Sequence, residues 1–158
     1  MADKKAAIEG LRTTILTSPA SKFGITPLAS GVWGVLMEFA VADSWVTLVA
    51  VLDGTTSLYF GGGGGIVGSG QKDPVRRANK HLLEAAGSFD GALKKTDVFP
   101  TPTAGHVHFY VLKADGVYAS ADVDEAALRE YKDDLAPLYC DAQDVITQIR
   151  LANPPPKK

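Results

Sequence analysis

Hydrophobic positions follow two different spacings along this chain of 158 residues. Near the N-terminus, Ile8, Leu11 and Ile15 recur at the spacing of one helix face, which predicts an amphipathic helix over residues 3–17. Pro19 should end this helix, because a proline disfavours helical geometry in the residue before it.

Two longer apolar runs follow, at residues 32–41 and 45–52, and both are rich in β-branched and aromatic residues. They predict two strands of a hairpin, and Asp53-Gly54 then turns the chain into a third strand that ends at Phe60. The run at 32–41 is apolar at odd and at even positions alike. We therefore expect both faces of this sheet to be covered by helices or by a partner subunit.

The second half of the chain continues with a helix, a hairpin and further helical spacing. Asp73 as N-cap, Pro74 and Gly87 frame a helix over residues 73–86. From residue 106 to residue 111 the aliphatic or phenylalanine positions alternate with histidine and tyrosine, and Asp115-Gly116 then forms a turn. This pattern predicts a second hairpin. A C-terminal helix should begin near Glu125, and Pro137 should end or kink it before the helical spacing resumes.

The order α-β-β-β-α-β-β-α predicts one α+β domain over residues 1–152, with a single central antiparallel sheet of about five strands covered by helices. Residues 153–158 are rich in proline and lysine, and we expect a disordered tail. In its order of elements the chain resembles the profilin-like group of domains, which includes the roadblock and longin families. That resemblance implies a scaffold or regulatory module that pairs with itself or with other proteins. No motif supports it, and roadblock domains usually place two strands before the middle helix and three after, so no functional residue is carried over.

Charge and composition exclude several functions. The net charge is −2, which gives no sign of the basic surface by which a protein binds nucleic acid or an anionic membrane. The most apolar stretch, residues 31–54, is interrupted by Glu38 and Asp43, which favours buried strands over a membrane span. Cys140 is the single cysteine, so it forms neither an internal disulfide nor a cysteine-based zinc site. With no secretory signal in its first residues, we expect a cytoplasmic protein.

Five consecutive glycines, Gly61–Gly65, are the least generic feature of the chain. Glycines 63, 65 and 68 match a dinucleotide-binding spacing, but no acidic residue follows about twenty positions later and no Walker lysine is present. Two interpretations stay open: a bulged edge strand with a tight loop, or an anion site built from backbone amides and the N-terminus of the next helix. The residues of that ligand-binding site would be Gly63, Gly65, Gly68, Gly70, Lys72 and Arg76.

Histidines and acidic residues give no complete catalytic or metal site. His106 and His108 lie two apart on a predicted strand and face the same side, but zinc needs a third protein ligand, and nothing in the sequence brings His81 close. Cys140 has no evident base beside it, and the acidic residues after Glu125 fit a solvated helix face. We therefore expect no metal, no cofactor and no catalytic residue.

Three functional hypotheses remain. The leading one is a non-catalytic, self-associating interaction or regulatory module, which we expect to form a homodimer and to bind a protein partner. The alternative is a binder of a small phosphate- or carboxylate-bearing ligand at the glycine-rich loop. The third is an enzyme of unrecognised type, whose site is assembled from residues scattered along the chain.

Overall fold

A computed structural model describes residues 2–41, 44–61 and 64–154, without the side chains of residues 2–6, 8 and 41. The helices are α1 (Ala2–Thr17), α2 (Asp73–Ala86), α3 (Glu125–Arg129) and α4 (Ala136–Ala152), with short 3-10 turns at Ala20–Phe23, Ser69–Gln71 and Asp90–Ala92. The strands are β1 (Val32–Val41), β2 (Ser44–Val51), β3 (Thr56–Phe60), β4 (Gly65–Ile66), β5 (Lys94–Thr96), β6 (His106–Lys113), β7 (Gly116–Ala119) and β8 (Val123–Asp124).

All the strands in the described ranges belong to one antiparallel sheet. Seven of them follow the order β4-β3-β2-β1-β6-β7-β5, and β8 pairs with β6 beside that path. The α+β class and the single antiparallel sheet agree with the sequence-based prediction, but the sheet has eight strands, not about five. The three additional strands are β4, β5 and β8, each only two or three residues long. Such segments carry no β-forming pattern and are strands only because a longer neighbour pairs with them.

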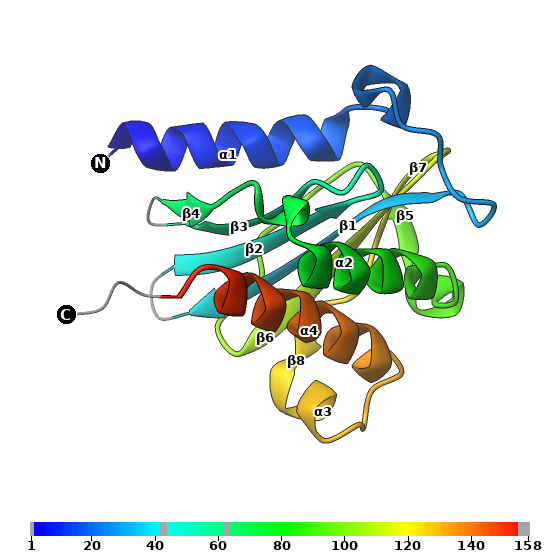
Figure 1. The fold of residues 1–158 in the computed structure, drawn as a ribbon. Coiled ribbons are helices and arrows are strands. Elements are labelled where there is room, and N and C mark those ends of the chain that lie inside the picture. Colours follow the sequence, from blue (N-terminus) through cyan, green and yellow to red (C-terminus); the bar gives the residue numbers. More distant parts are fainter. Residues whose placement is uncertain (1, 42–43, 62–63, 155–158) are drawn as a thin grey trace.

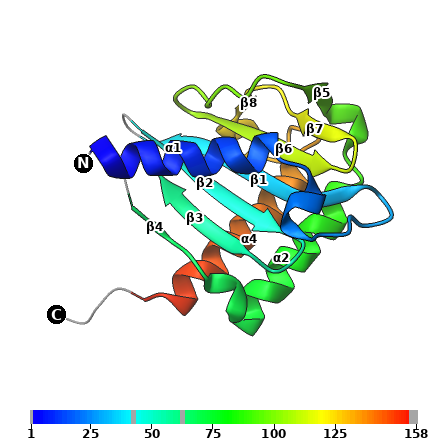
Figure 2. The same cartoon turned by 90° about the horizontal axis from the view of Figure 1, so that it is seen from above.

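The helices form layers on both faces of the sheet (Figures 1 and 2). Helices α2 and α4 pack side by side on one face and bury Val35 and Met37 of β1 beneath them. Helix α1 crosses the opposite face, where Leu36 and Trp33 belong to a second, smaller core. Cover on both faces explains why the central strand is apolar at odd and even positions alike.

The C-terminal helical region is divided in two, but the first helix ends at Arg129, well before Pro137, which was expected to end or kink it. Asp124 caps α3, since its carboxylate accepts a hydrogen bond from the backbone N–H of Ala126. Tyr131, which follows α3, has a φ of 57°, so the chain reverses there before α4 begins at Ala136. Pro137 lies in the first turn of α4, where its missing N–H costs no hydrogen bond.

Two other expectations concern the ends of elements. The cap of α2 is Lys72 rather than Asp73, which is already the first helical residue. Asn153 ends α4 and donates to the carbonyl of Ile149 and to the hydroxyl of Ser69, so the predicted tail begins as an ordered residue. Residues 155–158 lie outside the described ranges. Among the helices of the described ranges, none is long and apolar enough to cross a membrane.

Candidate functional site: a cleft beneath helix α1

Helix α1 is fixed to the sheet by a charged residue. The Arg12 guanidinium donates from Nε and Nη2 to the two carboxylate oxygens of Glu38, at 2.7 and 2.8 Å. Glu38 lies on the central strand and is 0% exposed, and it also accepts a hydrogen bond of 2.6 Å from the Thr47 hydroxyl. A buried carboxylate is tolerated because it is paired and hydrogen-bonded, and here one arginine and one threonine supply both partners.

The same arginine also holds the connection between β5 and β6. Arg12 Nη2 donates to the carbonyl of Phe99 at 2.8 Å, and its guanidinium lies 5.7 Å from the centre of the Tyr110 ring. The Tyr110 hydroxyl in turn donates to the carbonyl of Pro100 at 2.5 Å. Burial, and then the negative charge of Glu38, raise the pKa of Tyr110 to about 12. Arg12 thus joins α1, the central strand and this connection in one polar network.

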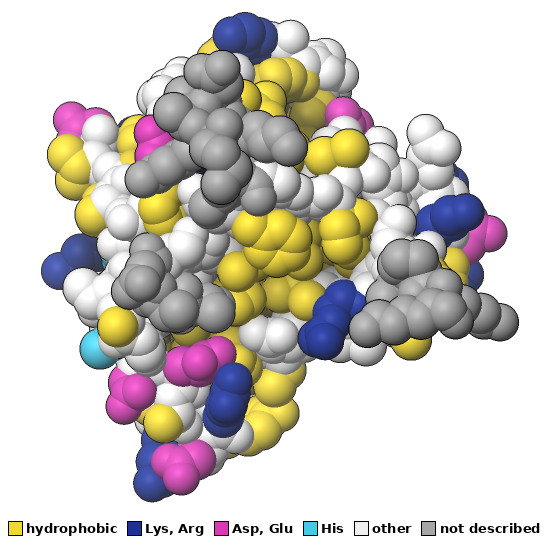
Figure 3. All heavy atoms as spheres, turned by 90° about the vertical axis from the view of Figure 1, so that its left-hand side faces the viewer, with side chains coloured by type: hydrophobic (Ala, Val, Ile, Leu, Met, Phe, Trp, Pro, Cys, Tyr) yellow, Lys and Arg dark blue, Asp and Glu magenta, His cyan; other side chains and the backbone are white. Residues whose placement is uncertain are grey.

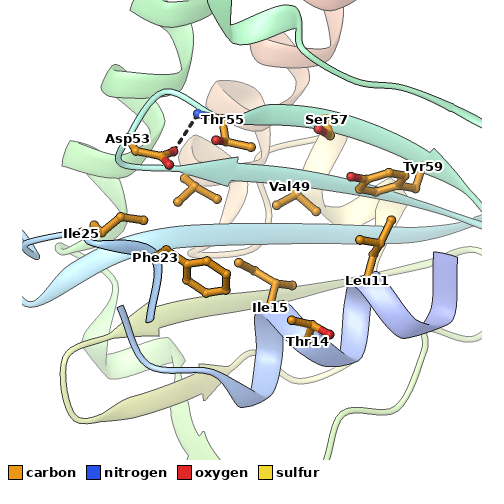
Figure 4. Close-up of a pocket in the computed structure, with 11 residues that line it drawn as sticks. Leu11, Thr14, Ile15, Phe23, Ile25, Val49, Asp53, Thr55, Ser57 and Tyr59 are labelled. Atoms are coloured by element: carbon orange, nitrogen blue, oxygen red, sulfur yellow. Dashed lines mark hydrogen bonds between the residues drawn. The ribbon is translucent and has the colours of Figure 1, made fainter. Parts of the chain in front are cut away.

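Beside this network, an open cleft separates α1 from strands β2 and β3 (Figure 4). Its volume is about 170 Å³. Leu11 and Ile15 extend from the helix toward the strands, and Val49 and Tyr59 form the opposite wall. The remaining lining residues are Thr14, Phe23, Ile25, Val51, Asp53, Thr55 and Ser57. The cleft is therefore mainly apolar, with a few polar groups at defined places.

Two polar side chains of the cleft have distinct positions. Ser57 is only 3% exposed and lies on the α1 side of β3, directly opposite Val49 in the strand pairing. Its hydroxyl has no hydrogen-bond partner among the described residues, and it is not among their fully buried side-chain atoms. Asp53 is exposed at one end of the cleft, where its carboxylate accepts a hydrogen bond of 2.9 Å from the backbone N–H of Thr55. Of the described lining residues, Asp53 is the only charged one.

The structure brings part of the sequence-predicted anion site together. Gly68, Gly70 and Arg76 line one surface hollow of about 260 Å³, next to the Asp53-Gly54 turn. The guanidinium of Arg76 donates from Nε to the carbonyl of Gly70, at 3.3 Å. Gly65 lies in the edge strand β4 and Lys72 is exposed, and neither lines the hollow. Gly63 lies outside the described residues.

Two of these glycines have clear structural reasons. A Cβ on Gly70 would lie 1.8 Å from the carbonyl oxygen of Gly54, so only glycine allows the backbone of this segment to approach the β2–β3 turn. Gly68 has a φ of 75°, a conformation that other residues rarely adopt. Close packing and backbone geometry therefore explain glycine at both positions without reference to a ligand.

The three histidines do not form one site. His108 lies on the α1 face of the sheet, where its ring packs near Tyr110 and its Nδ1 is 3.3 Å from the carbonyl of Pro100. His81 lies on α2, on the opposite face, and its Nε2 is 3.3 Å from the Asp141 carboxylate of α4. His106, at the start of β6, has its Nδ1 2.9 Å from the carbonyl of Ala104. Among the described residues, no group of three His, Cys, Asp or Glu side chains could hold a metal ion.

Cys140 lies in the second turn of α4 and is partly exposed. Its sulfur is 2.9 Å from the Tyr131 hydroxyl, and this contact is the first cause of a raised Tyr131 pKa. No histidine contact to Cys140 is found within the described part of the chain.

Sequence reasoning missed the residues of the cleft. Glu38 is a charged residue within an apolar strand, and such a residue is buried only when it is paired. The sequence does not identify the partner, because Arg12 is 26 positions away. Ser57 gave no signal at all, because a serine in a strand is common on a solvent-exposed face. Only the docking of α1 brings Arg12 to Glu38 and makes Ser57 part of a cleft.

No family model matches this chain, and neither a curated protein nor a solved structure is significantly similar to it.

Proposed function

We propose that this protein is a non-catalytic interaction module that binds an apolar group of its partner in the cleft beneath α1. The proposal is supported chiefly by the cleft itself, which is apolar, half open and formed by a helix and two strands. A ligand pocket is typically a concave, mainly apolar surface with a few polar groups that fix orientation. A regulatory module of this kind is also what the profilin-like order of elements implies, and we place it in the cytoplasm.

The chemistry around the cleft supports binding rather than catalysis. Glu38 is the nearest buried carboxylate, and both of its oxygens are committed to Arg12 and Thr47. A general acid or base must be free to exchange its proton with a bound substrate. Because Glu38 is enclosed by its own partners, it holds α1 in place and is not available for that exchange.

Toluene is a suitable first probe, because it carries no hydrogen-bonding group and therefore tests the apolar cleft alone. When toluene is titrated into the protein, the amide chemical shifts around Val49 and Tyr59 should change and reach saturation. Thr14→Trp should block the cleft from the exposed surface of α1 and abolish these changes, whereas Thr13→Trp, on the next exposed position, should not. The absence of saturable changes in the unmodified protein would refute the proposal.

Self-association is a second part of the proposal, and a separate surface supports it. At the end of the molecule seen in Figure 3, apolar side chains gather on the surface. Val67, which follows the described edge strand β4, is 65% exposed, and Leu151 is 70% exposed near the end of α4. Exposed apolar surface of this kind favours a contact between subunits.

Sedimentation equilibrium tests this second part. The mass should rise toward that of a dimer with increasing concentration, and Val67→Glu should return it to that of a monomer. Val98→Glu is the matched control, because Val98 is also 65% exposed but lies between β5 and β6. A monomer at every concentration would show that this surface does not join two copies.

The anion site is the alternative function, and the meeting of Gly68, Gly70 and Arg76 at one hollow favours it. Asp53 lines the same hollow and opposes an anion by its charge. Calorimetric titration with inorganic phosphate should detect binding that Arg76→Ala removes and that Arg77→Ala, on the same helix, retains. Equal loss in both variants, or no binding at all, would remove this alternative.

A further inference from the structure

The Ser57 hydroxyl is the polar feature of the cleft that its apolar lining does not explain. It belongs to a residue that is 3% exposed, and it has no hydrogen-bond partner among the described residues. Ser57 Oγ is not among the fully buried side-chain atoms of the described residues that lack a partner, so it opens onto the cleft, where water or a bound molecule can form a hydrogen bond with it. Ser57 lines the cleft, and a molecule bound there can supply the missing partner.

The size of the cleft limits what the molecule can be. The cleft has a volume of about 170 Å³, and an apolar cavity of about 150 Å³ is large enough for benzene. One six-membered ring with a small substituent therefore fills it. The walls are suited to such a ring, because Phe23, Tyr59 and the aliphatic side chains of α1 surround it (Figure 4).

The charge of the cleft limits the ligand further. Asp53 is the only charged residue among the described ones of the lining, and it is exposed at one end of the cleft. Arg12 is turned away from the cleft by its bonds to Glu38 and to the carbonyl of Phe99. An anionic ligand would meet a like charge without a compensating cation, so a neutral ligand is favoured.

We propose that the cleft beneath α1 binds a neutral aromatic group that carries one hydroxyl, with the ring between α1 and β3 and the hydroxyl on Ser57. The proposal rests on the proposed function, because it names the ligand class of the same cleft. A serine hydroxyl both donates and accepts, so it is a suitable partner for a phenol. The aliphatic and aromatic walls then bind the ring, and Ser57 fixes its orientation.

Three probes of similar size separate the contributions. p-Cresol has the methyl-substituted ring and the hydroxyl, toluene has the same ring without the hydroxyl, and benzoate has a carboxylate in place of the methyl group of toluene. Amide chemical-shift titrations should show p-cresol binding about threefold to tenfold more tightly than toluene, because one neutral hydrogen bond is gained. Benzoate should bind more weakly than toluene.

Ser57→Ala should reduce the affinity for p-cresol to that for toluene and leave toluene binding unchanged. Ser88→Ala, at an exposed serine after α2, is the matched control and should change neither. Ser57→Thr keeps a hydroxyl on the β-strand and should retain part of the preference for p-cresol.

The outcomes distinguish this inference from the proposed function on which it rests. If toluene and p-cresol bind equally in the cleft and Ser57→Ala changes neither, the role of Ser57 is refuted and the proposed function stands. If benzoate binds more tightly than p-cresol, the neutral class is wrong. If no probe binds in a Thr14-dependent manner, both proposals fail together.

Discussion

The ion pair between Arg12 and Glu38 shows how one buried charge fixes the position of a helix. Glu38 is 0% exposed, and Arg12 donates a hydrogen bond to each of its carboxylate oxygens. Removing one member of such a pair leaves the other as an uncompensated buried charge, whereas replacing both with apolar residues avoids that cost. The pair therefore makes opposite predictions for single and double replacement.

Arg12→Met should destabilise the protein by about 3–5 kcal/mol, because Glu38 keeps its burial and loses its cation. The double variant Arg12→Met with Glu38→Met should recover most of that loss. Urea unfolding of the three proteins measures both effects. If the free energy of unfolding of Arg12→Met lies within about 1 kcal/mol of that of the unmodified protein, water reaches Glu38 in solution and the buried pair is contradicted.

Tyr110 gives a prediction at high pH. Its pKa is raised to about 12 in the folded protein, first by burial and then by the charge of Glu38. Between about pH 10 and 12 the unfolded chain releases this proton while the folded protein keeps it, so the free energy of unfolding falls as the pH rises. The loss from this residue should reach about 2.5 kcal/mol above that window and be absent below it. In Tyr110→Phe, the fall in the free energy of unfolding with rising pH, measured by urea unfolding, should be smaller by that amount. An equal fall in the variant and in the unmodified protein would contradict the raised pKa of Tyr110.

Helix α1 contributes few buried side chains to the fold within its described part. Of its described side chains, Leu16 is buried in the core on this face, Ile15 is half-buried against it, and Leu11 is 51% exposed. Helices α2 and α4 each contribute several fully buried residues to the larger core. We therefore expect the amides of α1 to exchange through local opening, at a lower free energy than those of β1.

Gly10 offers a specific test of α1. It lies in the helix interior, and a Cβ there would meet nothing within 4 Å. Gly10→Ala should stabilise the protein by about 0.5–1 kcal/mol, since alanine loses less backbone entropy in a helix. Gly87→Ala is the contrasting variant, because its Cβ would lie 2.7 Å from the Cβ of Ser30, and it should destabilise. Urea unfolding compares the two, and a destabilised Gly10→Ala would argue against a regular helix at this position.

At the scale of the whole molecule, both described edges of the sheet are protected against pairing with another copy. At one edge β4 has only two residues, and at the other β5 has three, including Lys94 and Lys95. Short edge strands and lysines on an edge both oppose strand-to-strand association. The self-association that we propose therefore uses the apolar end of the molecule and leaves the edges free.

Replacing Lys94 and Lys95 by threonine should remove the protection of the β5 edge. We expect more light scattering on heating than in the unmodified protein, because a neutral β-prone edge is open to pairing. Replacement of Lys72 and Lys80, which lie outside the strands, removes the same charge and serves as control. Equal scattering in both double variants would assign the effect to net charge rather than to the edge.

The sequence by itself determined the elements that depend on local pattern. Helix α1, the hairpin of β1 and β2, helix α2 and the hairpin of β6 and β7 all followed from the spacing of apolar residues, from turns and from prolines. Apolar residues on both faces of β1 also predicted cover on both sides, because residues buried on both faces need packing partners on both.

Only the tertiary structure decided the rest, because those features depend on contacts between distant residues. Strands β4, β5 and β8 exist through pairing with longer neighbours, and Gly70 is explained by its approach to the turn at Gly54. His81 and His108 are separated because α2 covers one face of the sheet and His108 lies on the other face, beneath α1. The cleft is the clearest case, since its walls come from α1 and from β2 and β3, and Arg12 reaches Glu38 across 26 positions of sequence. A local pattern carries no information about which helix covers which face, so the candidate site became visible only once α1 was docked.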